Sequence, residues 1–257
     1  LAGHTGGVTC VELLPDNCLA SGSLDSTVRV WYYVSGALLA TLTGHAAGVS
    51  SLRLLNNVGW LASASLDNTV NVWLWSNGTL LATLAGHTDK VNALELLGQN
   101  GTLASGSADF TVKLWNAEGN GLPAATLSGH TGAVLCLKYL AGSGYLASGS
   151  ADYTVNLWDV TLARLVRTLT STGHTASVLA LDTLSDGTFL SAGSLDTLLV
   201  RADSSNGSIL QTVNTSGLIY ALEVFKERAP LVYITPRSAD VTNPLYVNST
   251  NRLVKLV

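Results

Sequence analysis

The sequence repeats itself with a period of about 42 residues, and this repeat limits the fold more than any other feature. The dipeptide Gly-His opens each clear copy, at His4, His45, His87, His130 and His174. Successive histidines are therefore 41, 42, 43 and 44 residues apart. Such regular spacing indicates an array of equal structural units, each of which packs against its neighbours.

Every clear copy contains the same four short segments in the same order. An apolar stretch such as VTCVEL follows the Gly-His, and then come a motif like LASGSLD, a segment like TVRVW and a last stretch like ALLATL. Alternating apolar and β-branched residues predict four strands per copy, joined by tight turns. Asn77-Gly78, Asn100-Gly101 and Asn206-Gly207 supply the positive φ that hairpin turns require. The sequence therefore predicts an all-β fold of four-stranded antiparallel sheets.

Gly-His early in each copy, with Asp and Trp at fixed later offsets in four copies, resembles the WD-repeat β-propeller family. The resemblance covers nearly the whole chain. It implies a single β-propeller domain over residues 1–257, in which every repeat forms one four-stranded blade. The expected repeats span about 1–43, 44–85, 86–128, 129–172, 173–214 and 215–257.

The sixth copy is the least regular. Leu218–Val224 matches an opening strand, Ser238–Tyr246 matches the SADYTVNLW segment with Tyr246 at the Trp position, and Arg252–Val257 matches an outer strand. This copy lacks Gly-His, and Pro244, which cannot donate a ladder hydrogen bond, predicts a bulge or an edge. We expect six blades within these residues, and a seventh if the protein continues beyond them.

A histidine, a serine and an aspartate recur in each regular copy, and the same residue types form the catalytic triad of hydrolases. A catalytic site is seldom copied into every unit. The resemblance implies instead that these residues and a tryptophan form a hydrogen-bonded structural network in each blade. Burial favours that role, because each unpaired buried polar group costs roughly 1–3 kcal/mol. The expected network residues are His4, Ser21, Asp25, Trp31, His45, Ser63, Asp67, Trp73, His87, Ser105, Asp109, Trp115, His130, Ser148, Asp152 and Trp158.

No enzyme motif remains outside these networks. All five histidines lie at Gly-His positions, and CxxC, HExxH, G-x-S-x-G and Walker-type loops are absent from the sequence. Three cysteines are too few for a disulfide framework, and we expect Cys10 and Cys136 to be small packing residues. We therefore predict no catalytic residue, no metal and no cofactor, and that the protein is not an enzyme.

The resemblance places partner binding on the face with the Gly-His loops and the turns between second and third strands. That face is plain, with neither an Arg cluster nor an aromatic cage, so charged ligands such as phosphopeptides are disfavoured. We predict an apolar contact patch there. The alternative is that the same side chains pack over the mouth of the central channel. The candidate residues are Leu24, Leu66, Lys90, Phe110, Tyr153 and Leu195.

Five Asn-X-Ser/Thr sequons provide candidate glycosylation sites if the protein is secreted, most of them on the opposite face. The alternative is chance, because the chain is rich in Asn, Ser and Thr, and several sequons contain the Asn-Gly that the turns need. The candidate acceptors are Asn77, Asn100, Asn206, Asn214 and Asn248.

Composition narrows the class of partner. A net charge of −4 argues against a nucleic-acid surface, and no apolar run reaches the ~18 residues of a membrane span. Charged residues are only 12% of the chain, about half of the usual ~25%. We predict a protein–protein interaction scaffold that binds other proteins or copies of itself. The alternative is a structural subunit of a repeating, extracellular, glycosylated assembly. Family habit favours the cytoplasm, whereas the sequons and low charge favour secretion, so localisation stays open.

Overall fold

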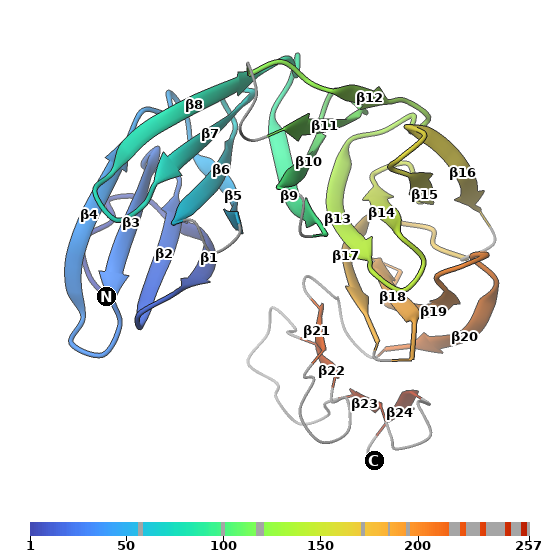
Figure 1. Cartoon of the computed structure of the whole chain (residues 1–257). Helices are drawn as coiled ribbons and strands as arrows, with labels where there is room; N and C mark the ends of the chain where they lie inside the picture. The colour runs from blue at the N-terminus through green and yellow to red at the C-terminus, as the bar shows by residue number, and fades with distance from the viewer. Residues whose placement is uncertain are drawn as a thin grey trace. The chain divides into compact units, whose positions relative to one another are not determined.

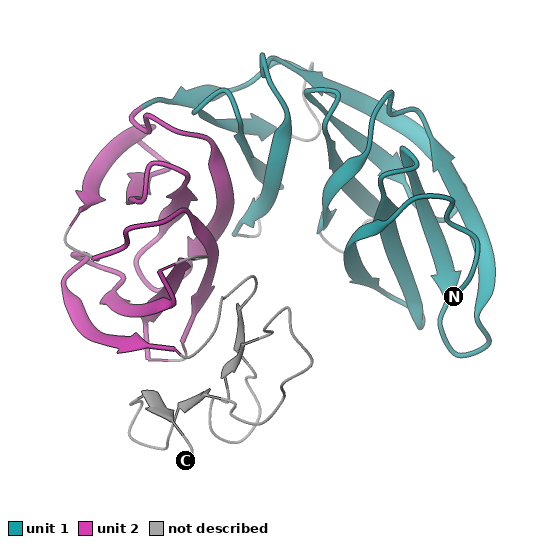
Figure 2. Cartoon of the chain, turned by 180° about the vertical axis from the view of Figure 1, so that it is seen from behind, with its two compact units in different colours: residues 1–128 teal, residues 129–257 magenta. Residues whose placement is uncertain are grey.

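The computed structural model describes residues 1–55, 59–98, 101–116, 121–170, 173–184, 186–193 and 196–215, and the backbone of four short strands nearer the C-terminus. These described residues form strands and turns, with no helix among them. The chain divides into two compact units, unit 1 (residues 1–128) and unit 2 (residues 129–257), which Figure 2 colours teal and magenta.

Unit 1 consists of three four-stranded antiparallel sheets, which we call blades 1 to 3 (Figure 1). The strands of each sheet pair in chain order, so each strand returns along its predecessor. The strands are β1 (Val8–Leu14), β2 (Cys18–Ser23), β3 (Thr27–Tyr32) and β4 (Ala37–Thr43) in blade 1; β5 (Val49–Leu55), β6 (Trp60–Ser65), β7 (Thr69–Leu74) and β8 (Thr79–Ala85) in blade 2; and β9 (Val91–Leu97), β10 (Thr102–Ser107), β11 (Val112–Asn116) and β12 (Ala125–Leu127) in blade 3.

Unit 2 contains two further sheets of the same kind, blades 4 and 5. Their strands are β13 (Val134–Leu140), β14 (Tyr145–Ser150), β15 (Val155–Asp159) and β16 (Arg164–Leu169), followed by β17 (Val178–Thr183), β18 (Thr188–Gly193), β19 (Leu198–Asp203) and β20 (Ile209–Asn214). The predicted all-β fold of four-stranded antiparallel blades is thus confirmed for all five Gly-His copies.

The predicted sixth copy contains four short strands. β21 (Leu222–Val224) pairs with β22 (Val232–Ile234), and β23 (Leu245–Val247) pairs with β24 (Leu253–Lys255), both antiparallel. Tyr246 lies in β23, whereas Pro244 lies outside the described residues. A single four-stranded sixth blade therefore stays a prediction.

Within each unit, the first strand of a blade packs across the first two strands of the blade before it. In unit 1, β5 contacts β1 and β2, and β9 contacts β5 and β6; in unit 2, β17 contacts β13 and β14. The sequence explains this packing, because the second and third strands are apolar or small on both faces and are buried on both. Each fully buried Val or Leu contributes roughly 1.5–3 kcal/mol to stability. The outer strands, such as β4, are mostly exposed.

Two of the cysteines pack beside glycines. A Cβ on Gly149 would lie 2.6 Å from Cys136 Sγ, its partner in the ladder, so only glycine fits there. Cys10 has the same relation to a glycine of blade 1. In blade 2 the smaller Ser51 faces Ala64 instead. In each of these pairs the larger residue of the first strand faces the smaller residue of the second strand. Burial raises the pKa of the Cys136 thiol to about 12.

Candidate functional site

Each regular blade contains a chain of three side-chain hydrogen bonds. In blade 3, Trp115 Nε1 lies 2.7 Å from Ser105 Oγ, which lies 2.7 Å from His87 Nε2. The other ring nitrogen, His87 Nδ1, lies 2.7 Å from Asp109 Oδ2. Blades 1, 2 and 4 repeat this chain with distances of 2.7 to 2.9 Å. The structure thus brings the predicted network residues together in four sets of four.

The donors in this chain determine the protonation of the histidine. The indole Nε1–H of Trp115 can only donate, so it donates to the Ser105 hydroxyl oxygen. The Ser105 hydroxyl then donates to His87 Nε2, and His87 Nδ1–H donates to Asp109. With a neutral imidazole, every polar group in this series of hydrogen bonds has a partner. Burial lowers the pKa of His87 and outweighs the opposing effect of the carboxylate, which is consistent with that neutral form.

The aspartate also builds the turn into the third strand. Asp109 Oδ1 accepts hydrogen bonds from Thr111 N at 2.9 Å and Thr111 Oγ1 at 2.7 Å, and Oδ2 accepts one from Thr88 N at 3.1 Å. Burial alone would raise the pKa of Asp109, but the hydrogen bonds from Thr111 and His87 outweigh it and lower the pKa to about 2. The carboxylate therefore ties the Gly-His loop to the turn between β10 and β11.

The order of hydrogen bonds from Asp109 through His87 to Ser105 is that of a hydrolase triad. Two features distinguish this network from a catalytic triad. The Ser105 side chain is fully buried, and its oxygen already accepts the hydrogen bond from Trp115. A nucleophile must reach a substrate, and this hydroxyl has no exposed surface from which to do so.

Blade 5 keeps part of the network, which the predicted set did not include. His174 lies 2.9 Å from Asp196 and 3.1 Å from Ser191. The motif LSAGSLD places the serine five residues before the aspartate, instead of four, but Ser191 still occupies the ladder position of the network serine. In the strand ladder Ala202 takes the Trp position, and its neighbour Arg201 pairs with Asp186. The Gly-His and LSAGSLD of the fifth copy were the sequence signal for this partial network.

The residue after each network aspartate has a positive φ. The φ values are 68° at Ser26, 73° at Asn68, 72° at Phe110, 73° at Tyr153 and 53° at Thr197. Bulky side chains are disfavoured in this conformation, which glycine and asparagine tolerate best. Phe110 and Tyr153 are nevertheless 46% and 49% exposed. Each is thus an exposed aromatic side chain on a backbone conformation that opposes it, a combination that points to function.

We call the surface formed by the Gly-His loops and these turns the loop face. In unit 1, Leu24 is exposed and Leu66 is half-buried. Both lie around Gly48, where an added Cβ would come within 2.9 Å of Leu24 Cδ2 and 3.5 Å of Leu66 Cδ1. Lys90, which is exposed, holds the position of Gly48 in blade 3, the blade of Phe110. The structure therefore brings Leu24 and Leu66 together and places Lys90 and Phe110 on the loops of blade 3.

The other candidate surface residues divide into described and undescribed positions. Tyr153 lies on the loop face of unit 2, and Leu195 lies outside the described residues. Asn77 and Asn206 are exposed in the turns that join third and fourth strands, and Asn214 is exposed at the end of β20. The remaining two sequon asparagines, Asn100 and Asn248, lie outside the described residues.

Sequence reasoning missed a row of charged residues on the first strands. Eight residues after its histidine, each described first strand has a charged side chain: Glu12, Arg53, Glu95, Lys138 and Asp182. In unit 1, Arg53 pairs with Glu95 and lies 3.7 Å from Glu12; in unit 2, Lys138 lies 2.7 Å from Asp182. The constant offset was the available signal. Within each unit, ion pairs of alternating sign therefore link neighbouring blades.

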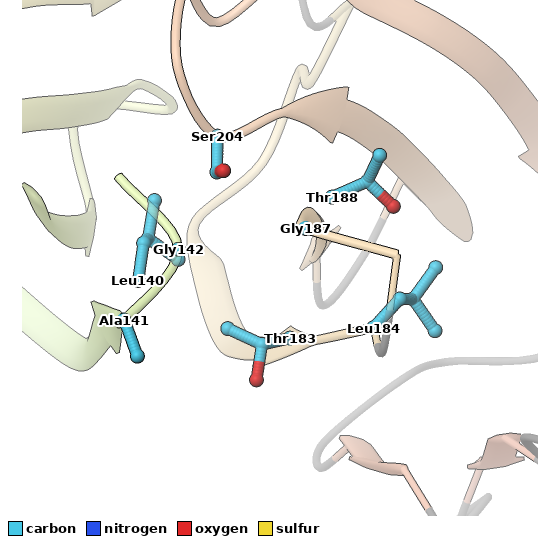
Figure 3. A pocket seen from close by; sticks show the side chains of 8 residues that line it. All are labelled: Leu140, Ala141, Gly142, Thr183, Leu184, Gly187, Thr188 and Ser204. Carbon is cyan, nitrogen blue, oxygen red and sulfur yellow. The ribbon is translucent and has the colours of Figure 1, made fainter. Parts of the chain in front are cut away.

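A cavity of about 360 Å³ lies between the turns of blades 4 and 5 (Figure 3). None of the lining residues that the structure describes is charged, so the cavity offers hydroxyls and backbone groups alone. They are Leu140, Ala141, Gly142, Thr183, Leu184, Gly187, Thr188 and Ser204. Elsewhere among the described residues, no cluster of three His, Cys, Asp or Glu side chains could hold a metal ion. The described part of the chain also contains no helix long and apolar enough to cross a membrane.

Comparison with known protein families identifies the same repeat. The family model described as WD domain, G-beta repeat matches residues 1–32, 36–73, 78–116, 121–159 and 164–200. Over 52 residues the chain is 50% identical to the pre-mRNA-splicing factor PRP46 of Eremothecium gossypii. That match covers 20% of this chain and 12% of the relative, so the similarity extends over a small part of that protein.

Proposed function

Because the chain belongs to the WD-repeat family, we propose that it is a non-enzymatic scaffold that binds other proteins through the loop face. The matched repeats cover most of the chain, and they support a binding role through repeated, rigid sheets. The fold alone does not identify the partner. Binding at the loop face is therefore inferred from the side chains exposed there.

The observation that carries the proposal is the strained, exposed Phe110. Its φ of 72° opposes a bulky side chain, yet its ring is almost half exposed. Asn68, at the same position in blade 2, shows which residue type this turn accepts without strain. Aromatic side chains are enriched where partners bind, because they bury much apolar area at little conformational cost. Leu24 and Leu66, together around Gly48 in the same unit, extend the apolar surface.

The buried networks argue against catalysis. In blades 2 to 4 the network serine is fully buried and accepts a hydrogen bond from tryptophan. The same arrangement recurs in blade after blade, as expected for a structural element. We therefore assign the network residues to folding and leave the loop face for binding.

A paired variant experiment tests this assignment. The chain with Phe110→Asn is immobilised beside the wild type and incubated with extract from the natural source, and the retained proteins are identified by mass spectrometry. We expect Phe110→Asn to lose a specific protein while its melting temperature is unchanged or higher, because asparagine relieves the strain. The matched control is Leu39→Ser, which removes an exposed leucine from outer strand β4. Equal retention by Phe110→Asn and the wild type would refute binding at the loop face.

The outer strands favour a second candidate, a structural subunit of a repeating glycosylated assembly. Leu38 and Leu39 on β4, and Leu80 and Leu81 on β8, are all more than 40% exposed. Such aliphatic pairs on the outer strands support association between copies. The mass of the protein from its natural source, measured native and denatured, tests this candidate. Glycan mass on Asn77 or a stable polymer supports it, and an unmodified monomer refutes it.

A further inference from the structure

The cavity between blades 4 and 5 lies within unit 2, at the end of the strands away from the loop face (Figure 3). Its walls come from the turns that join β13 to β14, β17 to β18 and β19 to β20. Leu140 and Ser204 on these walls are buried, whereas Gly142 and Gly187 at the mouth are exposed. The volume of about 360 Å³ falls in the range of roughly 300–1,000 Å³ that is usual for binding sites. The cavity is therefore large enough for a ligand and open to solvent.

The corresponding position between blades 1 and 2 is filled by a tryptophan side chain. Trp75 lies in the turn after β7, two residues after the network residue Trp73. It belongs to the hydrophobic core that blades 1 and 2 share, together with Leu14 and Cys18 of blade 1, and is only 9% exposed. In unit 1 the turn between the third and fourth strands of one blade thus packs an indole ring into the core that it shares with the blade before it.

Blade 5 has a small residue where blade 2 has this tryptophan. Ser204 lies two residues after Ala202, which holds the Trp position of the ladder, and so corresponds to Trp75. On the side of blade 4, Leu140 corresponds to Leu14, because each lies ten residues after the histidine of its copy. Unit 2 therefore keeps the leucine of the preceding blade, while a hydroxymethyl group takes the place of the indole ring.

The polar groups of the cavity suit an uncharged ring with one hydrogen-bonding edge. Ser204 and Thr183 contribute hydroxyls from two different turns (Figure 3). The Thr188 hydroxyl already donates to Asp186 and accepts from Arg201 Nε, and these two charged residues pair with one another. A charged ligand would therefore lose its hydration without gaining an opposite charge from the lining residues. An indole N–H can only donate, and a hydroxyl oxygen can accept its hydrogen bond.

Two glycines at the mouth leave room for the backbone of another chain. A Cβ added to Gly142 would lie 3.9 Å from Gly187 Cα, so the two residues face one another across the boundary between the blades. A Cβ added to Gly187 would meet no atom within 4 Å, and its φ of 82° is a conformation that favours glycine. Glycine allows close approach to the backbone. The mouth therefore admits a ring that is carried on a peptide chain.

We propose that this cavity binds a tryptophan side chain of a partner protein, in the way that the core between blades 1 and 2 holds Trp75. The site is separate from the loop face and does not depend on binding there. The probe is the peptide Gly-Gly-Trp-Gly-Gly with blocked ends, and NMR spectroscopy of the isotope-labelled chain follows the amide signals of Gly142 and Gly187. We expect both signals to shift on titration, with an affinity at least ten times that for the same peptide with alanine in place of tryptophan. No shift at millimolar peptide, or tighter binding of free indole than of the peptide, would overturn the proposal.

Two variants test whether the peptide occupies this cavity. Ser204→Trp gives blade 5 the residue that blade 2 has at Trp75. We expect it to raise the melting temperature by about 2–4 °C, because the new ring fills the cavity, and to weaken binding of the peptide at least tenfold. The matched control, Leu162→Trp, adds a tryptophan to the exposed turn between β15 and β16 and should leave both quantities unchanged. A lower melting temperature for Ser204→Trp would show that the cavity does not fit an indole ring, and unchanged binding would place the peptide elsewhere. Either result would overturn the proposal.

Discussion

Replacing Asp109 by alanine removes the group that joins the Gly-His loop of blade 3 to its turn. The carboxylate accepts four hydrogen bonds, from His87 Nδ1, Thr88 N, Thr111 N and Thr111 Oγ1. Thr88 is exposed, so water can replace the bond to its backbone N–H. The bonds from His87 and Thr111 are less accessible, and hydrogen bonds to a charged group contribute about 1.5–3 kcal/mol each. Counting two of them, we expect Asp109→Ala to lower the free energy of unfolding by about 3–6 kcal/mol.

Urea unfolding followed by tryptophan fluorescence measures this loss, because the buried Trp115 belongs to the same network. The matched control is Asp89→Ala on the same loop, where the exposed carboxylate accepts a hydrogen bond from Lys90 N. The control should change stability by no more than about 0.5 kcal/mol. Equal stability of Asp109→Ala and the control would show that the network does not support the fold.

Three further predictions concern pH, packing and strain. Stability falls as the pH drops from about 7 to 5, because the lowered pKa of His87 keeps the folded histidine neutral while the unfolded histidine takes up a proton. It falls again from about pH 5 to 2, because the lowered pKa of Asp109 stabilises the folded state only while its carboxylate is ionised. Urea midpoints at pH 8, 5 and 3 check both steps, and a rise on acidification would contradict them. Gly149→Ala destabilises by about 1–3 kcal/mol because its Cβ meets both Cys136 Sγ and Val178 Cγ1, and Cys136→Ala in the same chain restores only part of that loss; an unchanged melting temperature for Gly149→Ala would refute the close packing at this glycine. Tyr153→Asn raises the free energy of unfolding by about 1 kcal/mol, since asparagine tolerates a φ of 73°, and a loss of stability would mean that the ring packs against the fold.

The regular spacing of the repeat explains how much of the fold could be predicted. Each Gly-His and each LASGSLD-like motif fixes one strand register, so the four strands and the network of His87 follow from sequence once the period is recognised. The shifted serine of blade 5 could not be assigned in the same way. LSAGSLD has the length of the other motifs, and only the ladder shows that Ser191, and not Ala192, holds the network position.

The candidate surface was predictable in position and not in conformation. The sequence placed Phe110 and Tyr153 after their aspartates, but their positive φ and exposure depend on the turn that the carboxylate builds. The ion pairs of Arg53 were missed for a different reason. Its partners lie 41 and 42 residues away, and only packing of neighbouring blades brings them together.

The most direct test of binding at the loop face is a site-specific photo-crosslink. A photoreactive amino acid is placed at position 110 on the loop face or at position 39 on outer strand β4, and each chain is irradiated in extract from the natural source. We expect position 110 to capture a distinct protein that position 39 does not. Capture from position 39 alone would contradict the account and assign binding to the outer strands.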